Sequence, residues 1–350
     1  MKICHRFPAP RWRALSLIAA GCMVLAANAA NTPTEAPQSA MEAFAKAHDA
    51  VVGLRVGVAQ DARSAQTLGV ERSGSGVVIG ADGLILTIGY LMMEAETIEI
   101  ITQDNKKLPA KAVGYDVATG FGLVRALLPL RGAAPVAMGS AAALKAGEAM
   151  MAVTGAPGDG VDSQVAMTQV VSTRPFSGYW EYHIDLAVFT SPPIANHSGA
   201  PLFNQRGELV GVGSLFVSDA AGSGRRTPGN MFVPVDLLKP ILAELQQSGS
   251  TLQGRRPWIG LSSSEQGGRV QVLRVNPDSP AQQAGLAPGD LVLAVDGVTV
   301  ATLEAFYKKL WDRAQPDAEV SLTVVQGATL RTIVVKPVDR SSTMRKPAGI

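Results

Sequence analysis

The sequence has almost no cysteine and little histidine. Its two cysteines, Cys4 and Cys22, both lie within the first 30 residues. If this segment is removed, the rest of the chain can form no disulfide, no thiolate metal site and no cysteine nucleophile. The histidines beyond it are His48, His183 and His197. Few side chains in the rest of the chain can therefore serve as a nucleophile, a general base or a metal ligand.

Charge of either sign is sparse and nearly balanced. Charged residues make up 17% of the 350 residues and hydrophobic residues 47%, which excludes a disordered or collagen-like chain. The formal net charge is +2, but four basic residues lie among the first 13 positions. Without them, 27 basic residues face 29 acidic ones, a net charge of −2. Nothing in this balance predicts nucleic-acid binding.

The first 30 residues are typical of a signal peptide. A basic start is followed by an uncharged apolar run over residues 14–27 and then by small residues that a signal peptidase accepts. We therefore predict a signal peptide at 1–30 and export. The leader alone fits a Gram-negative periplasm or a Gram-positive exterior, and the periplasm is implied only together with the family resemblance given below. The alternative is an inner-membrane anchor with the chain facing the periplasm. The apolar run barely reaches the ~20 residues that a span needs.

The next part of the chain has the pattern of a β-protein. Residues 31–50 are predicted to be a lead-in with a helix over 41–50, capped by Ser39. From 51 to 217, short Val, Ile, Leu and Thr runs alternate with turn residues, which favours a sandwich or barrel over a doubly wound α/β fold. The predicted strands are 51–58, 75–79, 84–88, 97–102, 148–154, 169–172 and 208–213.

A helix is predicted to close this first domain. Apolar residues recur at helical spacing over 235–247, whereas 218–229 has the composition of a loop. The predicted boundaries are 51–247 for the first domain, 248–257 for a linker, 258–338 for a second domain and 339–350 for a tail that is expected to fray. The second domain is predicted to contain strands at 269–275, 291–295, 319–325 and 329–336, a hairpin turn at 296–297 and a helix at 303–312.

One segment carries a motif for nucleophilic chemistry. Residues 196–202 (Asn-His-Ser-Gly-Ala-Pro-Leu), followed by 207–211 (Gly-Glu-Leu-Val-Gly), resemble the nucleophile loop and the next strand of trypsin-like serine proteases of the periplasmic HtrA/Deg type. The resemblance implies that Ser198 is the nucleophile, with the N–H groups of Asn196 and Ser198 as oxyanion-hole donors. It also implies a mainly β fold, a trypsin-like double six-stranded β-barrel followed by an α+β PDZ domain.

Two other segments resemble this family in frame but lack its catalytic side chains. Residues 83–92 resemble the strand and turn that present the catalytic histidine, where this chain has Tyr90. Residues 116–124 resemble the segment that presents the catalytic aspartate, where this chain has Gly120. A serine hydroxyl needs a base, and a phenol with a reference pKa of about 10 stays protonated at neutral pH. These positions predict a degenerate triad, a pseudoprotease.

The nucleophile loop departs from the family in a second way. Asn196 and Ala200 stand where glycine is usual, and alanine tolerates a positive φ poorly, so a collapsed oxyanion hole is expected. No histidine or lysine lies in a motif that would replace the missing base. We also predict no metal and no cofactor, because no clustered ligands occur in the sequence.

The second domain resembles a bacterial PDZ domain. The resemblance rests on residues 258–261 (Trp-Ile-Gly-Leu), 279–286, 289–292 and 295–297, in this order and spacing. It implies that an extended peptide adds to a sheet edge while N–H groups of one turn hold its terminal carboxylate. The predicted peptide-binding residues are Trp258, Ile259, Gly260, Leu261, Phe306 and Leu310. The alternative is that the apolar members are core residues and that Tyr307 and Trp311 pack against the first domain.

Three hypotheses for function follow. In the first, an exported HtrA-like protein binds peptides or unfolded segments, including C-termini, as a non-catalytic chaperone, adaptor or regulator. In the second, an active periplasmic serine endopeptidase uses Ser198 with an unusual base. In the third, the chain is an inactive assembly subunit, since the resemblance implies a homotrimer or a hetero-oligomer with related proteases. Tyr90 and Gly120 favour the first hypothesis over the second, and a partner pull-down separates the first from the third.

Overall fold

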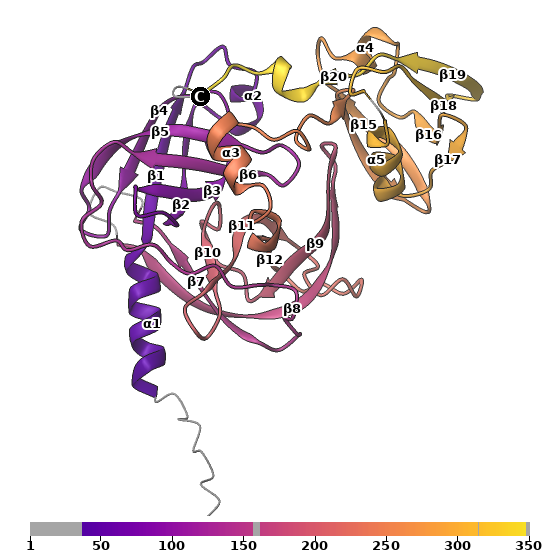
Figure 1. Cartoon of the computed structure of the whole chain (residues 1–350). Coiled ribbons are helices and arrows are strands. Elements are labelled where there is room, and N and C mark those ends of the chain that lie inside the picture. Colours follow the sequence, from indigo (N-terminus) through magenta and orange to yellow (C-terminus); the bar gives the residue numbers. More distant parts are fainter. Residues whose placement is uncertain (1–36, 157–161, 314, 348–350) are drawn as a thin grey trace, which may run out of the picture. The chain divides into compact units, whose positions relative to one another are not determined.

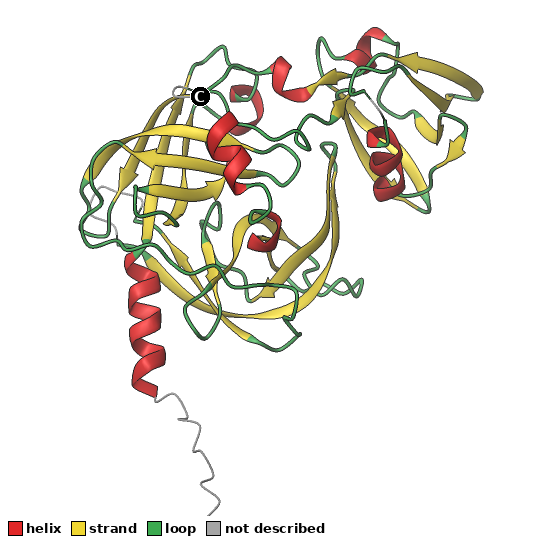
Figure 2. Cartoon of the chain, in the orientation of Figure 1, coloured by secondary structure: helices red, strands yellow, loops and turns green. Residues whose placement is uncertain are grey.

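Strands dominate the structure (Figure 2), a computed structural model that describes residues 37–156, 162–313 and 315–347. The predicted signal peptide and both cysteines lie outside these residues. Among the described residues, no helix combines the length and apolar character that crossing a bilayer requires.

The first six strands form a closed antiparallel barrel in the order β1-β2-β3-β6-β5-β4 (Figure 1). Its strands are β1 (Val51–Val58), β2 (Glu71–Val78), β3 (Leu84–Ile88), β4 (Ala95–Ile101), β5 (Lys107–Tyr115) and β6 (Phe121–Ala126). The helices are α1 (Pro37–Asp49), α2 (Ala65–Leu68) and the 3₁₀ turn η1 (Gly89–Leu91). β3 is buried along its whole length, which explains its unbroken run of Leu, Ile and Thr.

A second closed barrel follows in the order β10-β11-β12-β9-β8-β7. Its strands are β7 (Ala149–Thr154), β8 (Gln164–Gly178), β9 (Tyr182–Ser191), β10 (Pro201–Phe203), β11 (Leu209–Val217) and β12 (Gly229–Pro234). β8 and β9 form a long hairpin whose last paired residues are Gly178 and Tyr182. One hydrophobic core contains residues of both barrels, so the two pack as one unit.

The remaining strands build a smaller domain with its own core. Its main sheet has the order β14-β15-β16-β18-β19, which leaves β14 at an edge, and β13 pairs separately with β20. The strands are β13 (Pro257–Trp258), β14 (Leu261–Gln266), β15 (Arg269–Val275), β16 (Leu291–Val295), β17 (Val298–Thr299), β18 (Val320–Gln326), β19 (Thr329–Val335) and β20 (Val338–Asp339). The helices are α4 (Pro280–Gln283) and α5 (Leu303–Trp311).

The predicted fold class is confirmed by the two six-stranded barrels and the mixed domain after them. The single helix predicted over 235–247 is wrong. The chain forms a 3₁₀ turn, η2 (Val235–Leu237), and then a shorter helix, α3 (Leu242–Ser248). Pro240 lies between them, and a proline inside a helix removes an N–H donor and clashes with the preceding turn.

The sequence predicted a frayed tail over 339–350, but the described part of it, 339–347, is ordered. β20 pairs with β13, and η3 (Arg340–Thr343) follows it. Arg345 makes a two-pronged ion pair with Asp61, with N–O distances of 2.9 and 2.5 Å. Contacts of this kind between distant residues have no local sequence signal.

Removal of a buried aromatic ring tests the first barrel. Phe121 is fully buried in its core, so Phe121→Ala is expected to reduce the free energy of unfolding by about 3–5 kcal/mol through lost contacts and a cavity. Leu127, directly after β6, is 54% exposed. The control Leu127→Ala is expected to change stability by at most about 0.5 kcal/mol. Urea unfolding followed by circular dichroism measures both, and equal effects would contradict the barrel core described above.

Candidate functional site

Ser198 lies in the loop between β9 and β10, and backbone bonds hold this loop against both barrels. The Ser198 carbonyl accepts a hydrogen bond from the N–H of Ser75 in β2, at 2.8 Å. The N–H of Gly199 donates to the Gly213 carbonyl at 2.8 Å. A Cβ at Gly199 would come within 2.0 Å of the Ser75 carbonyl oxygen, so only glycine fits this approach.

Tyr90 is carried to Ser198 by the 3₁₀ turn η1 at the end of β3. Arg72 anchors this turn by donating from Nη1 to the Tyr90 carbonyl at 2.9 Å. The phenolic oxygen of Tyr90 lies 2.7 Å from Ser198 Oγ and 2.9 Å from the carbonyl oxygen of Ser214. Tyr90 and Ser198, which the sequence analysis singled out in separate segments, therefore belong to one hydrogen-bonded group.

The Tyr90 hydroxyl is the donor in both contacts. It donates toward Ser198 Oγ and toward the Ser214 carbonyl oxygen, which can only accept. Burial raises the pKa of Tyr90 to about 12, and the hydrogen bond with Ser198 acts in the opposite direction. At neutral pH the phenol is protonated and has no capacity to accept the proton of Ser198 as a base.

Gly120 lines the same cavity as Tyr90 but offers no side chain to it. Its φ is 83°, a backbone conformation that favours glycine. Its carbonyl accepts from the N–H of Gly89, next to Tyr90, at 2.7 Å. The nearby Asp116 carboxylate is not a replacement, because it accepts from the N–H and hydroxyl of Thr119 and stabilises the turn.

In the described part of the chain, no histidine hydrogen bonds with Ser198. His197 is partly buried, which lowers its pKa. His183 and His48 bond to serine and aspartate side chains elsewhere. The side-chain partner of Ser198 is Tyr90.

The strain expected at Ala200 is absent. Of the two positions where the family has glycine, Asn196 has a φ of 53°, which asparagine tolerates, and Ala200 does not adopt a positive φ. The N–H of Ala200 donates to the His197 carbonyl at 3.0 Å, and its carbonyl accepts from Gly213 at 2.8 Å. The strain at Ala200, on which the expectation of a collapsed oxyanion hole partly rested, is therefore not found.

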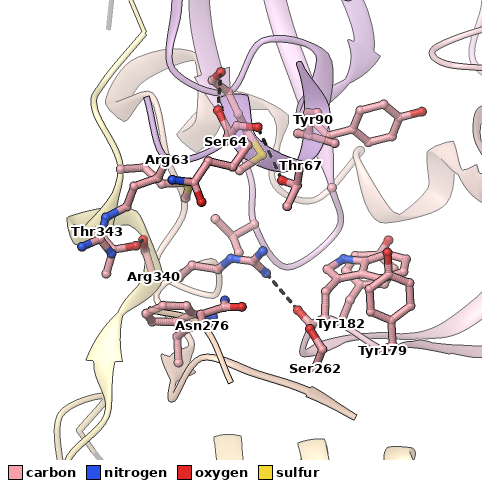
Figure 3. A pocket seen from close by; sticks show the side chains of 18 of the residues that line it. Arg63, Ser64, Thr67, Tyr90, Tyr179, Tyr182, Ser262, Asn276, Arg340 and Thr343 are labelled. Atoms are coloured by element: carbon pink, nitrogen blue, oxygen red, sulfur yellow. Dashed lines mark hydrogen bonds between the residues drawn. The ribbon is translucent and has the colours of Figure 1, made fainter. Parts of the chain in front are cut away.

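A cavity of about 540 Å³ is lined by Tyr90, His197 and Ser214, among others. Figure 3 shows Tyr90, Tyr179 and Tyr182 on its wall with Arg340 and Asn276. Trp258 and Leu261, two of the predicted peptide-binding residues, also line it. The cavity is thus lined both by residues around Ser198 and by residues of the smaller domain.

The turn predicted to hold a peptide carboxylate does hold a carboxylate, that of Glu181. The N–H groups of Ile259, Gly260 and Leu261 donate to its two oxygens at 3.1, 2.7 and 2.7 Å. Glu181 stands at the tip of the β8–β9 hairpin and is 6% exposed. Burial raises its pKa to about 7, and hydrogen bonds from Leu261 and Ile259 act in the opposite direction. Sequence analysis missed this residue, because nothing in its local pattern points to a turn 78 residues away.

The other predicted peptide-binding residues are less accessible. Phe306 and Leu310 on α5 are fully buried in the core of the smaller domain. The alternative prediction was that Tyr307 and Trp311 of this helix pack against the first domain. Tyr307 does contact it, because its hydroxyl donates to the Gly178 carbonyl of the β8–β9 hairpin at 2.8 Å. Trp311 instead bonds within its own domain, from Nε1 to the Pro257 carbonyl at 3.2 Å.

A group of three candidate metal ligands consists of His183, Asp185 and Glu304. The ammonium group of Lys308 lies 2.6 Å from Asp185 Oδ1 and 2.8 Å from Glu304 Oε1. A cation is therefore already supplied by the chain, and these residues are explained as an ion-pair network.

Two family models match the chain. A trypsin-like peptidase domain matches residues 74–212, and a PDZ domain matches residues 257–336. Among curated proteins, a probable periplasmic serine endoprotease DegP-like from Halomonas elongata is 28% identical over 294 residues, covering 79% of this chain and 58% of the relative. The putative serine protease HhoB from Synechocystis is 26% identical over 290 residues, covering 76% of this chain and 66% of the relative. The chain thus spans about three fifths to two thirds of these proteins.

Solved structures show the same fold. The HtrA-type protease AlgW with a tripeptide aligns with a TM-score of 0.53 at 20% identity, covering 85% of this chain and 96% of that one. The serine endoprotease from Yersinia pestis aligns with a TM-score of 0.53 at 22% identity, covering 87% and 99%. The chain therefore has a trypsin-like double barrel with a PDZ domain after it, and it is similar across both to DegP-like proteins.

Proposed function

We propose that this chain is a non-catalytic HtrA-type protein that binds peptides or unfolded segments, as a chaperone, adaptor or regulator. The observation that carries the proposal is the phenol of Tyr90, which lies 2.7 Å from Ser198 Oγ in the place where a base would have to act. Its second contact, with the Ser214 carbonyl, holds the phenolic proton.

Peptide hydrolysis by a serine needs a base near Oγ that later protonates the leaving amine. A phenol whose pKa is about 12 does neither at neutral pH. Gly120 supplies no carboxylate to orient a base. Loss of triad members leaves only binding and the oxyanion hole, a rate of about 10³–10⁴ over the uncatalysed reaction. Ser198 is then a structural partner of Tyr90 rather than a nucleophile.

Peptide binding is supported by what the chain retains. The N–H groups of Ile259, Gly260 and Leu261 converge on a carboxylate, which is the chemistry needed for a peptide C-terminus. Solved structures of the similar AlgW are described as complexes with a tripeptide and with a decapeptide. The relatives named as periplasmic support a periplasmic location for this chain as well.

The proposal predicts no hydrolysis that depends on Ser198. Casein cleavage and labelling by a fluorophosphonate are measured for the chain from Asn31 onward and for its Ser198→Ala variant. The cleavage rate and the extent of labelling are expected to be the same in both proteins. Cleavage or labelling by the wild type alone would show that Ser198 has a base, and the endopeptidase hypothesis would replace the proposal. Tyr90→His supplies an imidazole at the same place and is expected to raise Ser198-dependent labelling by about 10²-fold.

A second prediction concerns the proton of Tyr90. Because burial raises its pKa to about 12, Tyr90 is expected to stay protonated between about pH 8 and about pH 10.5. The ultraviolet absorbance of ionised tyrosine is titrated for the wild type and for Tyr90→Phe, with circular dichroism as a check on folding. The two curves are expected to coincide over this range. An excess of one phenolate in the wild type would mean that Tyr90 is available as a base.

A third prediction concerns restoration of the aspartate. A Cβ at Gly120 finds ordinary contacts, with the hydroxyl of Tyr182 at 3.5 Å, but its φ of 83° disfavours any L side chain. Gly120→Asp is therefore expected to lower the free energy of unfolding by about 1–2 kcal/mol. Gly120→Ala is the control that separates backbone strain from charge, and a similar loss is expected. Urea unfolding measures both, and unchanged stability in both variants would contradict the strain.

A further inference from the structure

The tip of the β8–β9 hairpin contacts the edge strand of the PDZ sheet. β14 is an edge strand, and the N–H of Ser263 within it donates to the carbonyl of Tyr179 in the tip, at 2.8 Å. Unpaired N–H groups of such an edge are what an extended peptide uses when it adds to a sheet. At Ser263 this donor is already occupied by the protein's own chain.

The same tip fills the carboxylate-binding turn. The two oxygens of Glu181 accept from Ile259, Gly260 and Leu261, and the tip carbonyl that pairs with β14 lies two residues before Glu181. The tip is a turn and not an extended strand. It nevertheless presents the two groups that an added peptide presents to such a groove, a backbone carbonyl to the edge strand and a carboxylate, here that of a side chain, to the turn.

Other contacts hold the tip in this position. The hydroxyl of Tyr307 on α5 donates to the Gly178 carbonyl at 2.8 Å, and Arg340 donates to the Trp180 carbonyl at 3.2 Å. Glu181 itself has a φ of 57°, a conformation that glutamate rarely adopts without such support. Three elements of the C-terminal half therefore bind the tip: the carboxylate-binding turn with β14, α5 and η3.

We propose that residues 178–182 are a built-in ligand of the PDZ groove, and that a peptide with a free C-terminal carboxylate binds there only after Glu181 has left the turn. This deepens the proposed function, since it rests on the peptide-binding part of it. Two carboxylates cannot share three N–H donors, so binding is competitive. The apparent affinity for a peptide is lowered in proportion to the fraction of molecules in which the tip is released.

The first experiment measures occupancy of the turn without any peptide. Amide hydrogen exchange over residues 257–263 is followed by mass spectrometry in the chain from Asn31 onward. Glu181→Gln keeps the shape of the side chain but removes its charge, and Glu181→Ala removes both. Glu71→Gln, at an exposed glutamate of β2, is the matched control. Circular dichroism shows that each variant is folded.

Exchange in this segment is expected to rise at least about tenfold in Glu181→Ala, less in Glu181→Gln, and not at all in Glu71→Gln. Exchange that stays at the wild-type level in folded Glu181→Ala would overturn the proposal, because the three N–H groups would then be protected by something other than the tip.

The second experiment measures competition with a defined probe. The probe is a fluorescein-labelled peptide with the sequence of residues 172–180 followed by one alanine, which ends in a free α-carboxylate. The same peptide with a C-terminal amide is the control. Fluorescence anisotropy is expected to show at least about tenfold tighter binding of the free acid to Glu181→Gln than to the wild type, with no such gain for the amide.

The outcomes separate the two claims. Equal affinity of the free acid for wild type and Glu181→Gln would overturn the proposed competition. Raised exchange in Glu181→Ala with no binding of the probe to any variant would support the tip as the occupant of the turn. It would refute the competition with an external peptide and remove the main support for the peptide-binding part of the proposed function.

Discussion

The hydrogen-bonded group formed by Tyr90, Ser198 and Ser214 connects the two barrels. Tyr90 belongs to the first barrel, and the two serines belong to the second. Each polar atom in this group has a partner, which buried polar atoms require. The same burial raises the pKa of the phenol and keeps it neutral. The group thereby joins the two barrels through neutral hydrogen bonds.

The surrounding backbone is adapted to this junction. Arg72 holds the carbonyl of Tyr90, and the carbonyl of Gly120 accepts from Gly89 one residue before Tyr90. Gly199 allows the Ser198 loop to approach β2 closely enough for the bond between Ser75 and Ser198. These backbone contacts hold the Ser198 loop and the Tyr90 turn in place.

Carboxylate recognition in the C-terminal half depends on a second constraint. Three N–H groups in one turn form a concave donor surface, and such a surface binds a carboxylate of any covalent origin. Burying the charge of Glu181 is costly, and these three hydrogen bonds offset part of that cost. A turn suited to peptide C-termini is consequently also suited to a glutamate that the chain itself delivers.

Prediction from the sequence worked best where structure is local. The bounds of β1, β3, β15 and β16 follow from runs of apolar residues between turn residues, and α5 follows from the spacing of its buried face. Strands with mixed polar faces, such as β5, were not predicted. The helix before the PDZ domain was placed too early, because the apolar spacing outweighed the effect of Pro240.

The sequence alone determined which residues occupy the two segments that resemble those presenting a catalytic histidine and aspartate. Tyr90 and Gly120 are read there without coordinates, because the resemblance rests on contiguous residues. Only the tertiary structure decided that the Tyr90 hydroxyl bonds to Ser198 and that Glu181 fills the carboxylate-binding turn. These pairs join residues 108 and 79 positions apart. Whether such residues come into contact depends on how the barrels and hairpins close, and the local spacing of residues in the sequence does not predict this.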